Sequence, residues 1–255
     1  MGKLFLSVVI PSYDEMANLQ KGVLDKVNHF LNEKKFPFEV IVVDDGSTDG
    51  SAQFVKKFCA GNSNFKLIDN PHLGKAGAVT TGVLNSKGDY VLFTDMDQAT
   101  PIEEIDNLLP YFDPPAGGGS DIVIGSRKDQ RKGSPWTRKI MAKGMVLLRT
   151  ALVGIHGISD TQCGFKMFRN AAAQVLFRRL NIIHNNFQKV KGSSVSAGFD
   201  VEILYIAQKL GYKIKEVPVK WLYVETRRVS PIKDSIAGVL DLLRIKMKDL
   251  RGEYR

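Results

Sequence analysis

Residues 39–50 read EVIVVDDGSTDG: a short run rich in β-branched residues leads directly into acidic residues, glycines and hydroxyl side chains. Apolar runs of this length are typical of strands that are buried on both faces, as in a parallel sheet. The polar residues that follow are common in turns and at helix N-termini. The stretch therefore predicts a buried strand over 39–43 that ends in a turn rich in carboxylates.

The same arrangement recurs along the first half of the chain. Comparable apolar runs lie at 4–10, 65–68, 90–94 and 122–125. Between them, the apolar spacing of amphipathic helices is found at 15–33, 51–58, 75–84 and 102–109. Alternating strands and helices predict an α/β fold with a mostly parallel central sheet flanked by helices. We expect residues 1–230 to form one such domain, followed by a basic amphipathic helix within 231–255.

The composition is that of a folded globular protein, with 44% hydrophobic and 25% charged residues. No apolar run reaches the roughly 18 residues that a membrane-spanning helix needs. The run at 4–10 is too short for a signal peptide and lacks its cleavage site. Cys59 and Cys163 cannot form a disulfide framework, and the four histidines have no metal-ligand spacing with them. These features predict a cytoplasmic protein.

The chain is strongly basic, with 36 Lys and Arg against 27 Asp and Glu and a formal net charge of +9. Such a charge favours polyanionic partners, which are nucleic acid, an anionic membrane or phosphorylated substrates. Basic residues gather between Arg127 and Lys143, near Trp136, either as a solvated face or as a phosphate site at a membrane surface. Because aromatic residues are not interleaved with them as in a stacking platform, we expect no nucleic acid partner.

Ligands of parallel α/β sheets bind beyond the carboxyl ends of the strands, so the residues after each predicted strand carry the chemistry. After 90–94 come Asp95-Met96-Asp97, whose two carboxylates would point the same way in an extended segment. They suit a hard divalent cation, Mg²⁺ or Mn²⁺, rather than a solvated turn. Asp44 and Asp45 follow 39–43, where a carboxylate either accepts hydrogen bonds from a nucleoside or caps a turn.

Two further strand ends bear on nucleotide binding. Lys75 opens a predicted helix between Gly74 and Gly77, which is either an anion site or a plain helix start with close packing at Gly77. The first strand is followed by Pro11-Ser12-Tyr13-Asp14-Glu15, without the three spaced glycines of a dinucleotide site. NAD is therefore not an expected ligand.

Four of these segments resemble, in order and spacing, those of family 2 glycosyltransferases, which have the GT-A fold. They lie within the first 125 residues or so and are Val9 to Glu15, Val42 to Gly50, Asn70 to Ala78 and Asp95-Met96-Asp97. Later segments are similar to the branch that glycosylates polyprenyl phosphates, namely Gly125-Ser126-Arg127, Arg138-Lys139, Asp160 to Phe168 and Gly198 to Glu202.

The resemblance implies an inverting enzyme that transfers a hexose, glucose from UDP-glucose, to a polyprenyl or dolichyl-type phosphate. It implies that the nucleotide sugar is held by Pro11, Tyr13, Glu15, Asp44, Asp45, Lys75, Asp95 and Gln98. Asp95 and Asp97 would carry the metal that bridges the diphosphate. Glucosyl members usually have a small residue where Gln98 stands, and this chain is similar to mannosyl members at that position.

The resemblance also implies residues for the acceptor, which are Arg127, Arg138, Lys139, Gln162 and Lys166. A phosphate oxygen is already anionic near pH 7, so no strong general base is needed. The implied catalytic residues are Asp95, Asp97, Arg127, Arg138 and Asp200. One alternative is a family 2 enzyme that acts on a saccharide hydroxyl and needs Asp200 or Glu202 as a base. Another is a non-catalytic module that binds a membrane surface or nucleic acid.

The last predicted helix has an apolar stripe with basic residues among its polar positions. The stripe consists of Ile232, Ile236, Val239, Leu240, Leu243, Met247 and Leu250. Such a stripe is either a core contact or the face of a helix that lies in the headgroup region of an anionic membrane. With a lipid phosphate as substrate, we expect a peripheral protein on the cytoplasmic face of a membrane. The sequence leaves the oligomeric state open.

Overall fold

The computed structural model describes residues 3–115, 117–127, 136–190, 197–222 and 231–254, except for the side chains of 136–143, 197 and 231–235. The described chain contains a sheet of seven strands in the order β3-β2-β1-β4-β6-β5-β7. The strands are β1 (Leu6–Ser12), β2 (Phe38–Asp44), β3 (Phe65–Asp69), β4 (Tyr90–Thr94), β5 (Ile122–Ser126), β6 (Phe165–Arg169) and β7 (Ile214–Pro218).

Most strand pairs in this sheet are parallel, which confirms the predicted α/β fold. β1, β2, β3 and β4 run parallel, and so do β5 and β7. β6 lies between β4 and β5 and is antiparallel to both. The pattern of apolar runs did not predict β7, because this edge strand is only partly buried and has two adjacent charged residues, Lys215 and Glu216, at its centre.

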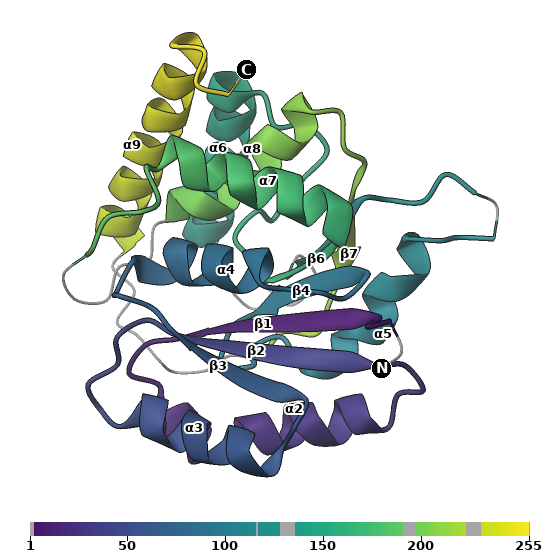
Figure 1. Ribbon diagram of the computed structural model, residues 1–255. Coiled ribbons are helices and arrows are strands. Elements are labelled where there is room, and N and C mark those ends of the chain that lie inside the picture. Colours follow the sequence, from purple (N-terminus) through teal and green to yellow (C-terminus); the bar gives the residue numbers. More distant parts are fainter. Residues whose placement is uncertain (1–2, 116, 128–135, 191–196, 223–230, 255) are drawn as a thin grey trace.

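Helices cover both faces of the sheet (Figure 1). One face packs against α2 (Val23–Asn32), α3 (Ser51–Gly61) and α5 (Ile105–Leu108). The other packs against α4 (Gly74–Leu84), α7 (Asn170–Ile183) and α8 (Ala197–Lys209). Outside these, α9 (Pro231–Leu250) packs against α6 (Trp136–Val153) and α8. Alternate strand residues supply the two cores: Val8 and Ile10 face the first, and Val9 faces the second.

Two predicted helices differ from the observed ones. The helix predicted over 15–33 is divided into α1 (Met16–Leu19) and α2, because Gly22 has a φ of 73°, which glycine adopts without a steric penalty. The apolar residues on which that prediction depended are all buried: Leu19, Val23, Val27, Phe30 and Leu31.

The helix predicted over 102–109 is also interrupted. It consists of a 3₁₀ turn at Ile102–Glu104, then α5, then a second 3₁₀ turn at Leu109–Tyr111. Pro110 contributes to the end of α5, since it lacks the N–H that would donate to the carbonyl oxygen of Asp106 four residues earlier.

Candidate active site

The sheet brings the predicted site residues to one edge. In the parallel register Ser12 lies opposite Asp44, so the carboxyl ends of β1 and β2 coincide. β6 runs the other way and begins at this edge, with Phe165 opposite Thr94. Gly164, just before β6, therefore lies against Asp95, where an added Cβ atom would come within 2.0 Å of Asp95 Oδ2. Any other residue at 164 would require this carboxylate to move.

The ammonium group of Lys75 pairs with Asp95 and also feels the negative charges of Asp200 and Asp97. The Lys75 Nζ atom lies 2.6 Å from Asp95 Oδ1. Burial lowers the pKa of Lys75, but the negative charges of Asp95, Asp200 and Asp97 outweigh this effect and raise it above its ordinary value. The extended conformation predicted for the Asp95-Met96-Asp97 segment is wrong, because β4 ends at Thr94 and Asp97 lies in a turn. In that turn the Ala99 N–H donates to Asp97 Oδ1 at 3.0 Å.

Lys166 and Asp200 form a buried ion pair beside this group. The Lys166 side chain is 0% exposed, and its Nζ atom donates to Asp200 Oδ1 at 2.5 Å and to the carbonyl oxygen of Cys163 at 2.6 Å. The same ammonium lies 5.1 Å from the centroid of the Phe93 ring. Asp200 comes from the first turn of α8, so the pair joins that helix to the start of β6.

Arg127, at the end of β5, is held in a fixed orientation by Asp160. Its Nε and Nη2 atoms each donate to one Asp160 carboxylate oxygen at 2.8 Å. Burial lowers the pKa of Arg127, whereas the hydrogen bonds and charge of Asp160 raise it, and the net change is upward. Asp160 is placed in turn by Glu216 of β7, which accepts from its backbone N–H at 2.8 Å. The guanidinium group also lies 5.9 Å from the Trp221 ring centroid.

The structure describes less of the surroundings of the other predicted acceptor residues. Gln162 is exposed just before β6, and its backbone N–H donates to Asp160 Oδ1 at 3.2 Å. Arg138 and Lys139 lie in the first half of α6, where the side chains fall outside the described residues. Their predicted roles remain predictions.

The two acidic residues at the end of β2 have different surroundings. Asp45 accepts hydrogen bonds from the backbone N–H groups of Leu73 and Gly74, each at 2.8 Å. It thereby satisfies amides at the start of α4. Asp44 is also buried; its Oδ2 atom accepts from the backbone of the following turn, but its Oδ1 atom has no hydrogen-bond partner within the described chain. A buried acceptor without a donor is costly, so Asp44 is the better placed of the two to receive a ligand's N–H or O–H.

Aromatic rings lie beside these carboxylates. Tyr13 stacks on His72, with ring centroids 4.4 Å apart and an interplanar angle of 17°. His72 Nδ1 lies 2.7 Å from the carbonyl oxygen of Asp45. Sequence reasoning missed His72 as a site residue; its position within the segment Asn70 to Ala78 was the available indication.

The remaining predicted donor residues lie at the same edge. Pro11 belongs to β1, and Glu15 precedes α1 and accepts from Asn18 Nδ2 at 2.5 Å. Gln98 has a φ of 49°, and its Nε2 atom donates to the carbonyl oxygen of Asp95 at 2.9 Å. The buried Gln98 Oε1 atom has no hydrogen-bond partner among the residues described.

Glu202 is directed away from this group, toward the C-terminal part of the chain. It accepts hydrogen bonds from His184 Nε2 at 2.7 Å, Lys248 Nζ at 3.0 Å and the Tyr254 hydroxyl at 2.5 Å. Burial raises the pKa of Glu202, but these partners together lower it below its ordinary value. Glu202 therefore ties α8 to α7 and α9.

Glu202→Gln is expected to lower the melting temperature at neutral pH. Because the pKa of Glu202 is lower in the folded than in the unfolded state, its contribution to stability is complete above the ordinary value of about 4.3 and is lost as the pH falls through the folded value. The melting temperatures of the variant and the wild type should therefore converge in acid. Calorimetry from pH 7 to pH 3 tests this, and a difference that persists unchanged at pH 3 would contradict it.

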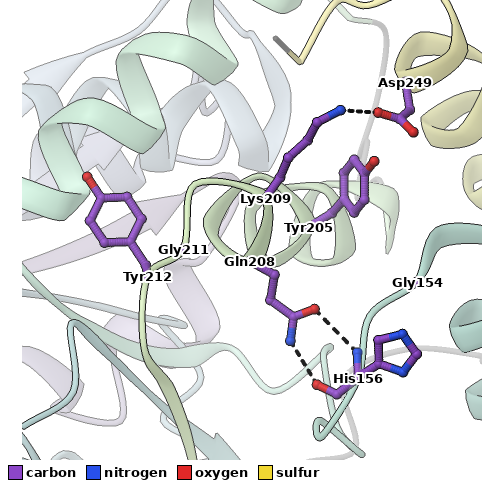
Figure 2. Close-up of a pocket in the computed structure, with 8 residues that line it drawn as sticks. All are labelled: Gly154, His156, Tyr205, Gln208, Lys209, Gly211, Tyr212 and Asp249. Carbon is purple, nitrogen blue, oxygen red and sulfur yellow. Dashed lines mark hydrogen bonds and ion pairs between the residues drawn. The ribbon is translucent and has the colours of Figure 1, made fainter. Parts of the chain in front are cut away.

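A surface hollow lies elsewhere, where α8 ends and α9 passes over it (Figure 2). Its lining consists of Gly154, His156, Tyr205, Gln208, Lys209, Gly211, Tyr212 and Asp249. The polar side chains in it bind one another: Lys209 pairs with Asp249, and Gln208 Nε2 donates to the carbonyl oxygen of His156 at 2.8 Å. None of the predicted site residues lines this hollow, which belongs to the packing of α9 on α8.

The predicted metal site consists of few protein ligands. In the described parts of the chain, no three His, Cys, Asp or Glu side chains are grouped to hold a metal ion. If Asp95 and Asp97 hold a metal ion as predicted, its other ligands would be oxygens of a substrate diphosphate and water. Mg²⁺ is typically bound in this way, through one or two carboxylates and substrate phosphates. The donor set therefore fits a hard cation that arrives with a nucleotide.

The chain belongs to glycosyl transferase family 2, whose sequence model matches residues 7–179. It is therefore a glycosyltransferase, as the motifs at the strand ends predicted. It is 34% identical over 265 residues to a dolichyl-phosphate beta-glucosyltransferase of Dictyostelium discoideum, a match that covers 99% of this chain and 77% of that protein.

Solved structures support the GT-A fold. Mannosyl-3-phosphoglycerate synthase from Rubrobacter xylanophilus superposes with a TM-score of 0.65 at 17% identity, over 98% of this chain and 75% of that one. Glucosyl-3-phosphoglycerate synthase from Mycobacterium tuberculosis, in complex with Mn²⁺, UDP and glucosyl-3-phosphoglycerate, gives a TM-score of 0.57 at 18% identity, over 97% and 80%. Among the described residues, no helix is both long enough and apolar enough to cross a membrane.

Proposed function

We propose that this enzyme transfers glucose from UDP-glucose to dolichyl phosphate or a related polyprenyl phosphate, with inversion at the anomeric carbon. The observation that carries the proposal is the ion pair of Lys75 with Asp95, at the sheet edge that also holds Asp44, where the negative charges of Asp97 and Asp200 act on the same ammonium group. The similarity to dolichyl-phosphate beta-glucosyltransferase over nearly the whole chain supports the choice of sugar and acceptor.

The donor half of the proposal uses the end of β2. Asp44 Oδ1 would accept a hydrogen bond from the uracil or the ribose, which would satisfy its buried lone pairs. Tyr13, stacked on His72, offers an aromatic face close to the same strand ends. Mg²⁺ or Mn²⁺ bound to Asp95 and Asp97 would neutralise charge on the departing diphosphate. The crystal structure of a related fold with Mn²⁺ and UDP supports a divalent cation.

Lys75 would add a fixed positive charge beside the diphosphate. Its ammonium lies 2.6 Å from Asp95 Oδ1, and the surrounding negative charges raise its pKa, so it remains protonated at neutral pH and can donate to a phosphate oxygen. When a nucleotide with its cation binds, the carboxylates and Lys75 can each find a partner of opposite charge. Preorganised charges of this kind stabilise the transition state without reorganisation during the reaction.

The acceptor half uses Arg127. Two of its N–H groups are bound to Asp160, which leaves the others in a fixed direction for an acceptor phosphate. The phosphate oxygen would attack the anomeric carbon on the face opposite UDP as the bond to the UDP oxygen breaks, which inverts the configuration. No proton needs to be removed from an ionised phosphate. Glu202 is hydrogen-bonded to His184 and Lys248, so it is not available as a general base. This weakens the alternative in which Glu202 deprotonates a saccharide hydroxyl acceptor.

Glycolipid synthesis from labelled donors tests the proposal. The protein is incubated with Mg²⁺ or Mn²⁺, a short polyprenyl phosphate in detergent, and UDP-glucose, GDP-mannose or UDP-N-acetylglucosamine in separate reactions. We expect label in the organic extract with UDP-glucose and β-configuration in the product. Label from GDP-mannose alone would overturn the proposal that glucose is transferred and would connect the choice of mannose with Gln98. Transfer only to soluble saccharides would overturn the proposal of a lipid phosphate acceptor.

Arg127→Ala is expected to raise the KM for the polyprenyl phosphate about tenfold or more, since a charge-assisted hydrogen bond contributes about 1.5–3 kcal/mol. The KM for the nucleotide sugar should change by less than about twofold. Steady-state kinetics with each substrate varied measures this, and the exposed Arg178 of α7 provides the control Arg178→Ala. A larger effect on the nucleotide sugar would assign Arg127 to the donor diphosphate.

A lipid acceptor requires the enzyme to work at a membrane. We place the protein peripherally on the cytoplasmic face, where nucleotide sugars are available. The high positive charge of the chain favours anionic lipids at that surface.

A further inference from the structure

The C-terminal helix α9 has two apolar faces, and only one is covered by the protein. Leu242 and Ile245 are each 2% exposed and belong to the core between the sheet and its helices. The other face, here called the outer stripe, is 42% to 75% exposed and consists of Ile236, Leu240, Leu243, Met247 and Leu250. Its members are spaced four and three residues apart, so they form one continuous row along the helix.

The charges of α9 are distributed unequally around the outer stripe. By helical position, Arg244 and Arg251 lie along one side of it and Lys246 along the other. The arginine side chains are 72% and 66% exposed. Of the acidic side chains that the structure describes in this helix, Asp241 and Asp249 are only 15% and 19% exposed. The outward side of α9 is therefore apolar with basic margins.

Interactions with the protein explain where the acidic groups are. Asp241 Oδ2 accepts from the backbone N–H of Gly198 at 3.0 Å, and its Oδ1 atom accepts from Arg244 at 2.9 Å. Asp249 pairs with Lys209 of α8. Beyond the helix, Glu253 lies 3.9 Å from Arg251 and is 35% exposed.

A second copy of the chain would not satisfy this surface. Two such helices packed face to face would bring Arg244, Lys246 and Arg251 of both copies together at the margins of the contact. Helix pairs of this kind normally place acidic residues opposite basic ones there. An anionic bilayer offers both requirements at once, with phosphate and carboxylate headgroups for the basic margins and acyl chains for the apolar row.

We propose that the outer stripe of α9 is a docking surface for anionic lipid bilayers, with the helix lying in the plane of the headgroups. The inference deepens the proposed function and rests on it for its purpose, which is to bring the catalytic edge to a lipid-linked acceptor. Asp241 connects the docking surface with the catalytic edge, because its hydrogen-bond partner Gly198 lies two residues before Asp200 on α8. Docking through α9 therefore holds the helix that carries Asp200 close to the membrane.

Vesicle co-sedimentation tests the docking surface in the full-length protein. The wild type should sediment with phosphatidylcholine vesicles that contain phosphatidylserine several-fold more than with pure phosphatidylcholine. The difference should shrink as salt shortens the screening length from ~10 Å at 0.1 M to ~3 Å at 1 M. Leu243→Glu should weaken binding to the anionic vesicles at least tenfold. Ile182→Glu, at an equally apolar residue that is 74% exposed on α7, is the matched control and should bind as the wild type does.

Two further measurements separate the possible causes of a negative result. Melting temperatures of the variants should equal that of the wild type; if Leu243→Glu unfolds, Leu250→Glu at the 75% exposed end of α9 takes its place. Light scattering should show the same mass for the wild type and Leu243→Glu. A dimer that Leu243→Glu converts to a monomer, or vesicle binding that neither variant weakens, would overturn the proposal.

Transfer to a detergent-dispersed acceptor distinguishes this inference from the proposed function. If docking is correct, Leu243→Glu transfers to that acceptor as the wild type does but has lost transfer to the same acceptor in anionic vesicles. Equal losses in detergent and in vesicles would overturn docking. If neither protein transfers to a polyprenyl phosphate in any form while vesicle binding behaves as expected, the docking surface stands and the proposed function fails.

Discussion

Asp97→Asn is expected to lower kcat/KM for glycosyl transfer by on the order of 10³-fold or more while leaving the melting temperature unchanged. The substitution removes one of two carboxylates available to a divalent cation, and such a cation contributes several kcal/mol to the stabilisation of charge on a leaving group. Asp97 is partly exposed in a turn, so we expect the fold to tolerate the loss of its charge. Its hydrogen bond from Ala99 can be retained by the asparagine oxygen.

Kinetics and calorimetric titration of UDP, each with Mn²⁺ and with EDTA, measure this prediction. The wild type should bind UDP more tightly with Mn²⁺, and the variant should lose most of that gain. Asp25→Asn, an exposed acidic residue in the first turn of α2, is the control for a loss of negative charge. If the wild type and Asp97→Asn bind UDP with equal affinity, with or without metal, the assignment of a metal site to Asp95 and Asp97 is wrong.

Asp200→Ala is expected to reduce the free energy of unfolding by about 3–5 kcal/mol, because it leaves the ammonium of a fully buried lysine without its counterion. Lys166 has no exposed surface through which water could replace the lost carboxylate. The double substitution Lys166→Met with Asp200→Leu should recover most of the stability, since apolar residues can replace a buried ion pair at little cost. Urea denaturation of the three proteins measures these differences.

The more exposed pair of Lys34 and Asp106 is the control, and Asp106→Ala should cost about 1 kcal/mol or less. Wild-type stability in Asp200→Ala would contradict the role of the ion pair. The double variant also separates structure from catalysis. If it is stable and still inactive, Asp200 or Lys166 takes part in the reaction beyond holding α8 against β6.

Much of the fold could be predicted because its elements have local signatures. The β-branched runs before Asp44 and Asp95 become buried parallel strands, and Val27 and Phe30 of α2 face the core as their spacing requires. The acidic residues after these strands lie at one edge because parallel strands end together. Residue pattern and strand direction therefore suffice to bring together the residues of the proposed donor half.

The acceptor half could not be predicted in the same way. Arg127 follows the carboxyl end of β5, but Gln162 and Lys166 reach the edge because β6 is antiparallel, so that the start of that strand and Gly164 lie beside Asp95. The direction of a strand depends on pairing with strands distant in sequence, so the residues of the strand itself do not indicate it. Local sequence also does not distinguish Asp44 from Asp45, which are adjacent and equally acidic. Only Asp45 accepts hydrogen bonds from the amides at the start of α4.

The sequence by itself determined that α9 is an amphipathic helix with basic residues, since helical spacing of apolar residues is a local property. Only the tertiary structure decided which apolar residues are covered. Leu242 and Ile245 are buried by contacts with other helices, whereas Leu240 and Leu243 remain exposed. The two rows have the same residue types and the same spacing, and they differ only in what packs against them. Burial is a property of the assembled helices, because it depends on surfaces contributed by segments far apart in the chain.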